Sequence, residues 1–168
     1  MTTLVEKDAC ELLDADHIAV KHLFVEYARL AFGSGDAAAA EKLALARKIC
    51  SELTVHAQIE EEIFYPALRE VMKEDADLLE EAEAEHAEAK AMIATIEQMP
   101  AADAAMDDQV AELNRAIEHH VKEERDELFP KARSADLDLE ALGAHLQERQ
   151  QELMAGSRTP AAKPGRRR

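Results

Sequence analysis

Four long segments of this chain place apolar side chains at every third or fourth position, which is the spacing of one face of an α-helix. The segments cover residues 8–32, 37–65 (extendable to about 73), 76–98 and 104–129. A shorter segment over 136–154 repeats the pattern with leucines. Long helices with short connections bury their apolar faces against one another. We therefore predict an all-α, up-down-up-down antiparallel four-helix bundle with a short fifth C-terminal helix packed on it.

Glycine and proline mark the expected ends of these segments. The breaks are Gly33-Ser34-Gly35 with Asp36 as a candidate N-cap of the next helix, then Pro66, which closes or kinks the second segment, Pro100 and Pro130, and finally Ser134 to Asp136. After residue 154 the sequence becomes rich in proline, glycine and basic residues, a composition typical of disorder. We expect one folded domain over 1–154 and a disordered basic tail over 155–168.

The chain is strongly acidic, with 36 acidic and 20 basic residues and a formal net charge of −16. An acidic surface repels phosphate groups, which argues against a nucleic-acid partner. We expect the basic tail to be solvated, and a protein partner through it stays an unsupported alternative. No window of about 18 residues is apolar and uncharged, and the N-terminus lacks the features of a signal peptide, so we expect a cytoplasmic protein with no membrane partner. Cys10 and Cys50 are too few for a disulfide framework or a cysteine-based metal site.

The second and fourth segments contain the same motif. A histidine is followed by a glutamate four residues later, an aromatic residue nine later and a proline ten later, in the runs His56–Pro66 and His120–Pro130. The first and third segments share a shorter motif, an acidic residue and a histidine followed by a lysine, in Asp16–Lys21 and Glu85–Lys90. The chain thus repeats a helix pair, with one histidine on the first helix and H-x-x-x-E on the second.

These histidines and glutamates are expected to meet in the middle of the bundle. The histidines lie at similar distances from the turns between their helices, which puts them at similar heights, and the i, i+4 spacing puts each His–Glu pair on one face. The six predicted metal ligands are His17, His56, Glu60, His86, His120 and Glu124.

Two carboxylates in an apolar core must be paired, protonated or bound to a cation. The apolar stripes contain no Arg or Lys to pair with them, which favours a cation. Histidine and glutamate together suit iron, zinc or manganese. Six ligands exceed the needs of one tetrahedral zinc ion but suit two metal ions bridged by carboxylates, with an oxo, hydroxo or other anion between them and an open position for a small oxidant.

The order H…HxxxE…H…HxxxE, with Phe-Tyr-Pro and Leu-Phe-Pro after the glutamates, resembles the hemerythrin-like HHE cation-binding domain from about Asp16 to Pro130. The resemblance implies a four-helix bundle with a non-haem di-iron centre, in which zinc or manganese are possible substitutes. It implies terminal ligands at His17, His56, His86 and His120, and bridging carboxylates at Glu60 and Glu124.

The chain departs from the oxygen-carrying hemerythrins at two places. They have a second histidine where this chain has Lys90, and their last carboxylate follows the fourth-helix histidine by five residues, whereas Glu124 follows by four. The four-His, two-Glu set is more similar to di-iron domains linked to iron–sulfur repair, nitrosative stress or iron sensing.

Three functions fit this sequence. The leading hypothesis is a di-iron protein that binds O2, NO or peroxide for oxygen sensing or for handling oxidative or nitrosative stress, with or without turnover. The second is iron storage, delivery or sensing, including iron–sulfur repair, without turnover. The third is a metal-free helical interaction module.

Other polar residues of the helices are expected to lie outside the ligand set. The remaining histidines (His22, His119 and His145) are expected at the surface, although His119 with Glu123 forms an alternative H-x-x-x-E pair. By helical angle, Tyr27 and Tyr65 are expected to point away from the stripes. The amines of Lys21 and Lys90 are expected either to reach water or to donate to a bridging carboxylate or bound anion.

Overall fold

The computed structural model describes residues 7–32 and 36–158, and every regular element within these ranges is helical. The elements are, in chain order, α1 (Ala9–Ala31), α2 (Asp36–Ile59), η1 (Glu60–Phe64), α3 (Tyr65–Val71), η2 (Lys73–Asp75), α4 (Ala76–Glu97), α5 (Ala104–Glu123), η3 (Glu124–Leu128), α6 (Phe129–Ser134) and α7 (Leu139–Arg158). The predicted all-α fold is confirmed.

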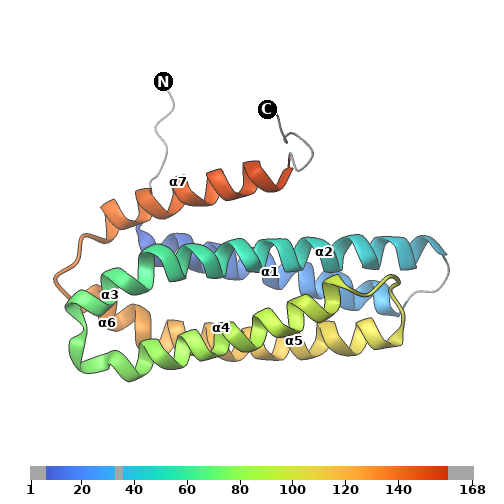
Figure 1. The fold of residues 1–168 in the computed structure, drawn as a ribbon, viewed down its shortest axis with the longest axis horizontal. Helices are drawn as coiled ribbons and strands as arrows, with labels where there is room; N and C mark the ends of the chain where they lie inside the picture. The colour runs from blue at the N-terminus through green and yellow to red at the C-terminus, as the bar shows by residue number, and fades with distance from the viewer. Residues whose placement is uncertain (1–6, 33–35, 159–168) are drawn as a thin grey trace, which may run out of the picture.

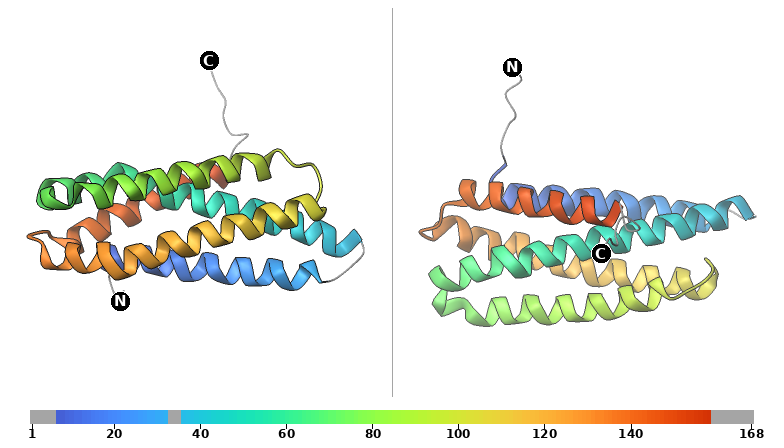
Figure 2. Two further views of the ribbon diagram at one scale, coloured as in Figure 1. Left: turned by 90° about the horizontal axis from the view of Figure 1, so that it is seen from below. Right: turned by 45° about the horizontal axis from the view of Figure 1, so that its top comes forward.

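Helices α1, α2, α4 and α5 form an antiparallel four-helix bundle (Figure 1). The short helices α3 and α6 prolong α2 and α5 at one end of it. Helix α7 lies outside the bundle, along α1 and α2 and away from α4 and α5, as the views in Figure 2 also show. This is the predicted fifth helix, and its position makes the two helix pairs of the repeat unequal, because one pair is covered and the other is not.

Local signals in the sequence start the helices. Asp8 caps α1, since its side chain accepts a hydrogen bond from the backbone N–H of Glu11 (2.8 Å) while the Glu11 side chain accepts one from the N–H of Asp8 (3.1 Å). Asp103 caps α5 in the same way, through the N–H of Met106. The expected Gly33-Ser34-Gly35 break lies outside the described residues. Helix α7 extends to Arg158, past the expected end at residue 154, and residues 159–168 of the expected tail lie outside the description.

The prolines after the repeated motif do not end their helices. The chain stays helical through Pro66 to Val71 and through Pro130 to Ser134. In both places the turn before the proline widens into a π-helix, η1 and η3. A proline lacks the N–H for a regular helical hydrogen bond, and its ring crowds the carbonyl four residues earlier. A wider turn relieves that crowding and adds one residue to the helix.

The apolar core consists of two clusters. One lies at the end of the bundle near α3, α6 and α7, and includes Leu13, Phe64 and Leu146. The other lies toward the opposite end and includes Ile49 and Leu113. The two cysteines are buried free thiols, one in each cluster. Between the clusters, the centre of the bundle is polar.

Candidate metal centre

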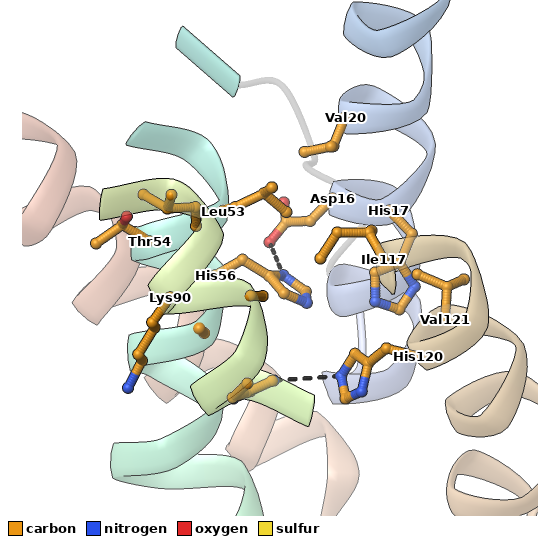
Figure 3. Close-up of a pocket in the computed structure, with 14 residues that line it drawn as sticks. Asp16, His17, Val20, Leu53, Thr54, His56, Lys90, Ile117, His120 and Val121 are labelled. Carbon is orange, nitrogen blue, oxygen red and sulfur yellow. Dashed lines mark hydrogen bonds and ion pairs between the residues drawn. The ribbon is translucent and has the colours of Figure 1, made fainter. Parts of the chain in front are cut away.

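Six polar side chains meet between the two apolar clusters. His17 comes from α1, His56 from α2, His86 from α4 and His120 from α5, while Glu60 and Glu124 are the first residues of η1 and η3. All six are at most 7% exposed. Figure 3 shows three of the imidazole rings turned toward one space from different helices. The structure thus brings together every predicted ligand residue.

The donor atoms fall into two groups, His17, His56, Glu60 and Glu124 in one, and Glu60, His86 and His120 in the other. Within each group, one donor atom per residue lies within 4.8 Å of the others. Glu60 belongs to both. Its Oε2 lies 3.5 Å from Nε2 of His56, and its Oε1 lies 3.0 Å from Nε2 of His86.

Glu124 connects the two groups in the same way. Its Oε1 lies 3.0 Å from Nε2 of His17, and its Oε2 lies 3.3 Å from Nε2 of His120. Each glutamate therefore faces one histidine of each group with a different oxygen. This is the geometry expected of carboxylates that bridge two ions.

The first group has the donor set and the unused atoms that a cation requires. Four buried atoms have no hydrogen-bond partner in the described part of the chain: Nε2 of His17, Nε2 of His56, Oε2 of Glu60 and Oε1 of Glu124. Two of these atoms, Nε2 of His17 and Oε1 of Glu124, lie 3.0 Å apart. Unpaired buried polar atoms cost about 1–3 kcal/mol each. An ion held between these lone pairs would remove that cost, so the residues fit a bound metal.

Without a metal, proton transfer balances the charges of the site. Burial opposes protonation of His56, but Glu60 and Asp16 outweigh it and raise its pKa well above the usual value. Burial likewise opposes the charge on Glu60, but His56 and the other histidines hold the pKa of this carboxyl well below its usual range. Burial also disfavours charge on His120, yet the neighbouring carboxylates, Glu124 foremost, raise its pKa to about 12. A metal ion must displace these protons, so binding releases protons and strengthens as the pH rises.

A second carboxylate orients each histidine ring from the outside. The partners of the Nδ1 atoms are Asp14 for His17 (3.2 Å), Asp16 for His56 (3.1 Å), Glu61 for His86 (2.7 Å) and Glu85 for His120 (2.7 Å). With Nδ1 occupied, every Nε2 faces the centre, which is how ligand histidines are commonly held. The prediction of the site included none of these four acids. The repeated acid immediately before His17 and His86 was a usable signal, since Asp16 and Glu85 each serve the histidine of the neighbouring helix.

Basic side chains pair with some of these outer carboxylates. Lys90 donates to Glu61 (2.7 Å), and Arg125 donates to Asp14 (2.6 Å). Lys90 is therefore a donor near the site, but to an outer carboxylate and not to a bridging glutamate. Lys21 is exposed and makes no ion pair with a described residue.

The expected orientation of Tyr65 was wrong. Its hydroxyl lies in the second group, where it donates to Glu124 (2.7 Å) and Glu60 (3.2 Å) and lies 3.3 and 3.4 Å from Nε2 of His86 and His120. In a regular helix Tyr65 would point about 140° away from Glu60. The extra residue in η1 takes back about one residue of rotation, ~100°, and turns the ring inward. Burial and the two carboxylates raise the pKa of Tyr65 well above its usual value, which keeps the phenol a donor in the absence of metal.

Other candidate residues lie where the sequence placed them. Tyr27 is buried away from the site and donates to Asp107 (2.7 Å). His22, His119 and His145 are exposed. The alternative H-x-x-x-E pair of His119 and Glu123 forms at the surface. Nε2 of His119 lies 3.2 Å from both Glu123 and Glu85.

A small cavity adjoins the histidines. It has a volume of about 30 Å³, and its lining includes the four imidazoles and the apolar side chains of Val20, Leu53, Ile93, Ile117 and Val121 (Figure 3). A single water requires about 10–15 Å³ measured in the same way. The cavity therefore has room for a diatomic molecule or a peroxide but not for a metabolite.

Comparison with known proteins agrees with this geometry. The family profile of the hemerythrin HHE cation-binding domain matches residues 8–132. This chain belongs to the hemerythrin HHE cation-binding domain family. No curated protein sequence matches the chain significantly. Among solved structures, the chain is similar to a hemerythrin HHE cation binding domain-containing protein from Mycobacterium kansasii, with a TM-score of 0.76, 23% identity and 95% of each chain covered.

The match extends the family assignment to the fold, because this hemerythrin HHE structure covers nearly the whole chain. At 23% identity it shows a shared architecture and not a shared reaction. The HHE domain binds cations, and the buried His/Glu groups described above are where this chain would hold them. No helix in the described part of the chain is long and apolar enough to cross a bilayer.

Proposed function

We propose that this HHE domain holds two iron ions and binds a small oxidant (O2, NO or peroxide) at them, in oxygen sensing or in the handling of oxidative or nitrosative stress. The observation that carries the proposal is the shared use of both glutamates. Glu60 and Glu124 each present one oxygen to either histidine pair, so that the six side chains offer donor atoms for two adjacent ions. The ions would be held by His17, His56, His86 and His120 as terminal ligands, with Glu60 and Glu124 as bridges.

The size and lining of the cavity favour a small, weakly polar ligand. Its small volume leaves no room for a large substrate, and its lining beside the imidazoles is mainly apolar, with Asp16, Thr54 and Lys90 as the other polar members. When bound, an iron pair supplies open coordination positions and redox chemistry for such a ligand. The protein orients the imidazoles through the outer carboxylates and places the Tyr65 hydroxyl where it can donate to Glu60 and Glu124.

Iron storage or delivery is the second candidate, and the burial of the ligands weighs against it. All six are nearly inaccessible, which suits a resident ion better than one that is handed to an acceptor. A metal-free helical module has less support, since the fold would then leave four buried polar atoms unpaired among the described residues.

The test begins with the metal content of protein expressed in iron-replete medium. We expect about two irons per chain and a change in the visible spectrum on adding peroxide or NO. His86→Ala should lose metal and this response while keeping its helical content, and His22→Ala, which alters an exposed histidine on α1, should behave as wild type.

The outcomes separate the candidates. Repeated consumption of peroxide or NO would show catalysis, and a spectral change without consumption would show sensing or binding. Rapid loss of iron to an apo acceptor with no response to oxidants would favour delivery. No metal even after anaerobic loading would refute the di-iron proposal.

A further inference from the structure

One side chain of helix α7 bonds an outer carboxylate of the candidate centre. Nε2 of Gln150 donates to Oδ2 of Asp16 at 2.8 Å, and the same oxygen lies 3.1 Å from Nδ1 of His56. The amide of Gln150 and the ring of His56 thus hold one carboxylate oxygen between them. Through this chain of contacts, an element outside the four-helix bundle reaches a predicted metal ligand.

The four outer carboxylates differ in what neutralises them. Asp14 contacts Arg125, Glu61 contacts Lys90, and Glu85 contacts His119, so three of them face a basic side chain. No basic side chain other than His56 itself contacts Asp16 within residues 7–32 and 36–158. Asp16 is instead held by the neutral amide of Gln150, and an outer carboxylate fixes the orientation of the imidazole and makes it a stronger ligand.

The packing around Gln150 leaves Asp16 free to move if the amide is lost. Gln150 and Asp16 line a hollow between α7, α1 and α2, together with Glu52 and Val55. The Asp16 side chain is 23% exposed. The apolar anchor of α7 is Leu146, fully buried and one turn before Gln150. If the Gln150 amide is removed, the Asp16 side chain can therefore turn toward water while Leu146 stays packed in the core.

We propose that Gln150 is a positioning residue, which holds Asp16 against His56 and so couples the docking of α7 to the ion site formed by His17 and His56. This inference rests on the two-ion centre proposed above. It adds that the two ions are not equivalent. The ion beside His56 depends on α7 through Asp16. Glu61 and Glu85, which orient the second pair of rings, are paired instead with Lys90 on α4 and His119 on α5. Helix α7 meets η1 through the surface pair of Arg149 and Glu62.

The experiment measures release of ferrous iron from the anaerobically loaded full chain into a coloured chelator. Wild type gives the reference release rate for each of its two irons. Gln150→Ala should release one iron about tenfold faster and the other at the wild-type rate, because loss of an outer partner costs about 10–100-fold in metal affinity. Gln147→Ala is the control, since Gln147 is exposed on the same helix and makes no hydrogen bond with a described residue.

A second variant tests the route through Asp16. Asp16→Asn should accelerate the release of the same iron. The double variant with Gln150→Ala should release it no faster than Asp16→Asn alone, because the two residues act in series. Equal release of both irons from Gln150→Ala at the wild-type rate would overturn the inference. So would equal acceleration of both with a lower melting temperature of the metal-free protein, which would show a structural role. A wild type that holds no iron would overturn the proposed function as well, and this result is distinct from the other two.

Discussion

The Tyr65 hydroxyl contacts both Glu60 and Glu124 in the metal-free protein. Tyr65→Phe keeps the ring and removes this donor, leaving Glu60 and Glu124 with fewer partners. We expect the free energy of unfolding of the metal-free protein to fall by about 1.5–3 kcal/mol, the range for hydrogen bonds to charged groups. Urea unfolding monitored by circular dichroism measures this.

Tyr27→Phe is the matched control for that variant. Tyr27 also donates to a carboxylate at 2.7 Å, but Asp107 lies far from the histidines. It should lose stability and keep its metal-binding properties, whereas Tyr65→Phe should also change the visible spectrum of the iron-loaded protein. If Tyr65→Phe alters neither stability nor spectrum, the hydroxyl plays no part in the centre.

At the scale of elements, Gly143 allows α7 to lie against the start of α1. A Cβ at this position would lie 2.8 Å from the carbonyl carbon of Asp8, 2.9 Å from the nitrogen of Ala9, and closer still to the carbonyl oxygen of Lys7. Backbone atoms cannot move aside as a flexible side chain can. Gly143→Ala should therefore lower the free energy of unfolding by about 1–3 kcal/mol, despite the better helix propensity of alanine. Thermal unfolding is the measurement.

Gly156 provides the comparison on the same helix. A Cβ there meets nothing within 4 Å. Gly156→Ala should leave stability unchanged or raise it by up to about 1 kcal/mol through helix propensity alone. Equal effects of the two substitutions would contradict the close contact between α7 and α1.

At the scale of the whole molecule, the buried centre couples metal binding to folding. A ligand that binds only the folded state at 100 times its Kd adds about 2.7 kcal/mol of stability. For a chain of this size, each kcal/mol corresponds to roughly 2–4 °C. Chelation of the metal should therefore lower the melting temperature by roughly 5–10 °C, as scanning calorimetry would show. An unchanged melting temperature would instead favour the metal-free helical module.

The sequence predicted the helices, their antiparallel order and the meeting of six side chains. Apolar periodicity and an i, i+4 spacing are local properties, and both are readable from one helix at a time. The π-helices were not predicted, because each lies near the end of its helix and leaves the apolar stripe before it unchanged. The extra residue rotates only the residues that follow it. The error at Tyr65 has this cause.

What the sequence by itself determined is which residues face the core: the stripes fix one face per helix, and the four histidines and two glutamates lie on those faces. The tertiary structure decided which atoms meet. It turned Tyr65 inward, paired Asp16 and Glu85 with histidines on neighbouring helices, and laid α7 over one helix pair so that Gln150 reaches Asp16. The physical reason is that contacts between helices depend on rotation and height, which accumulate along a helix and are set by packing.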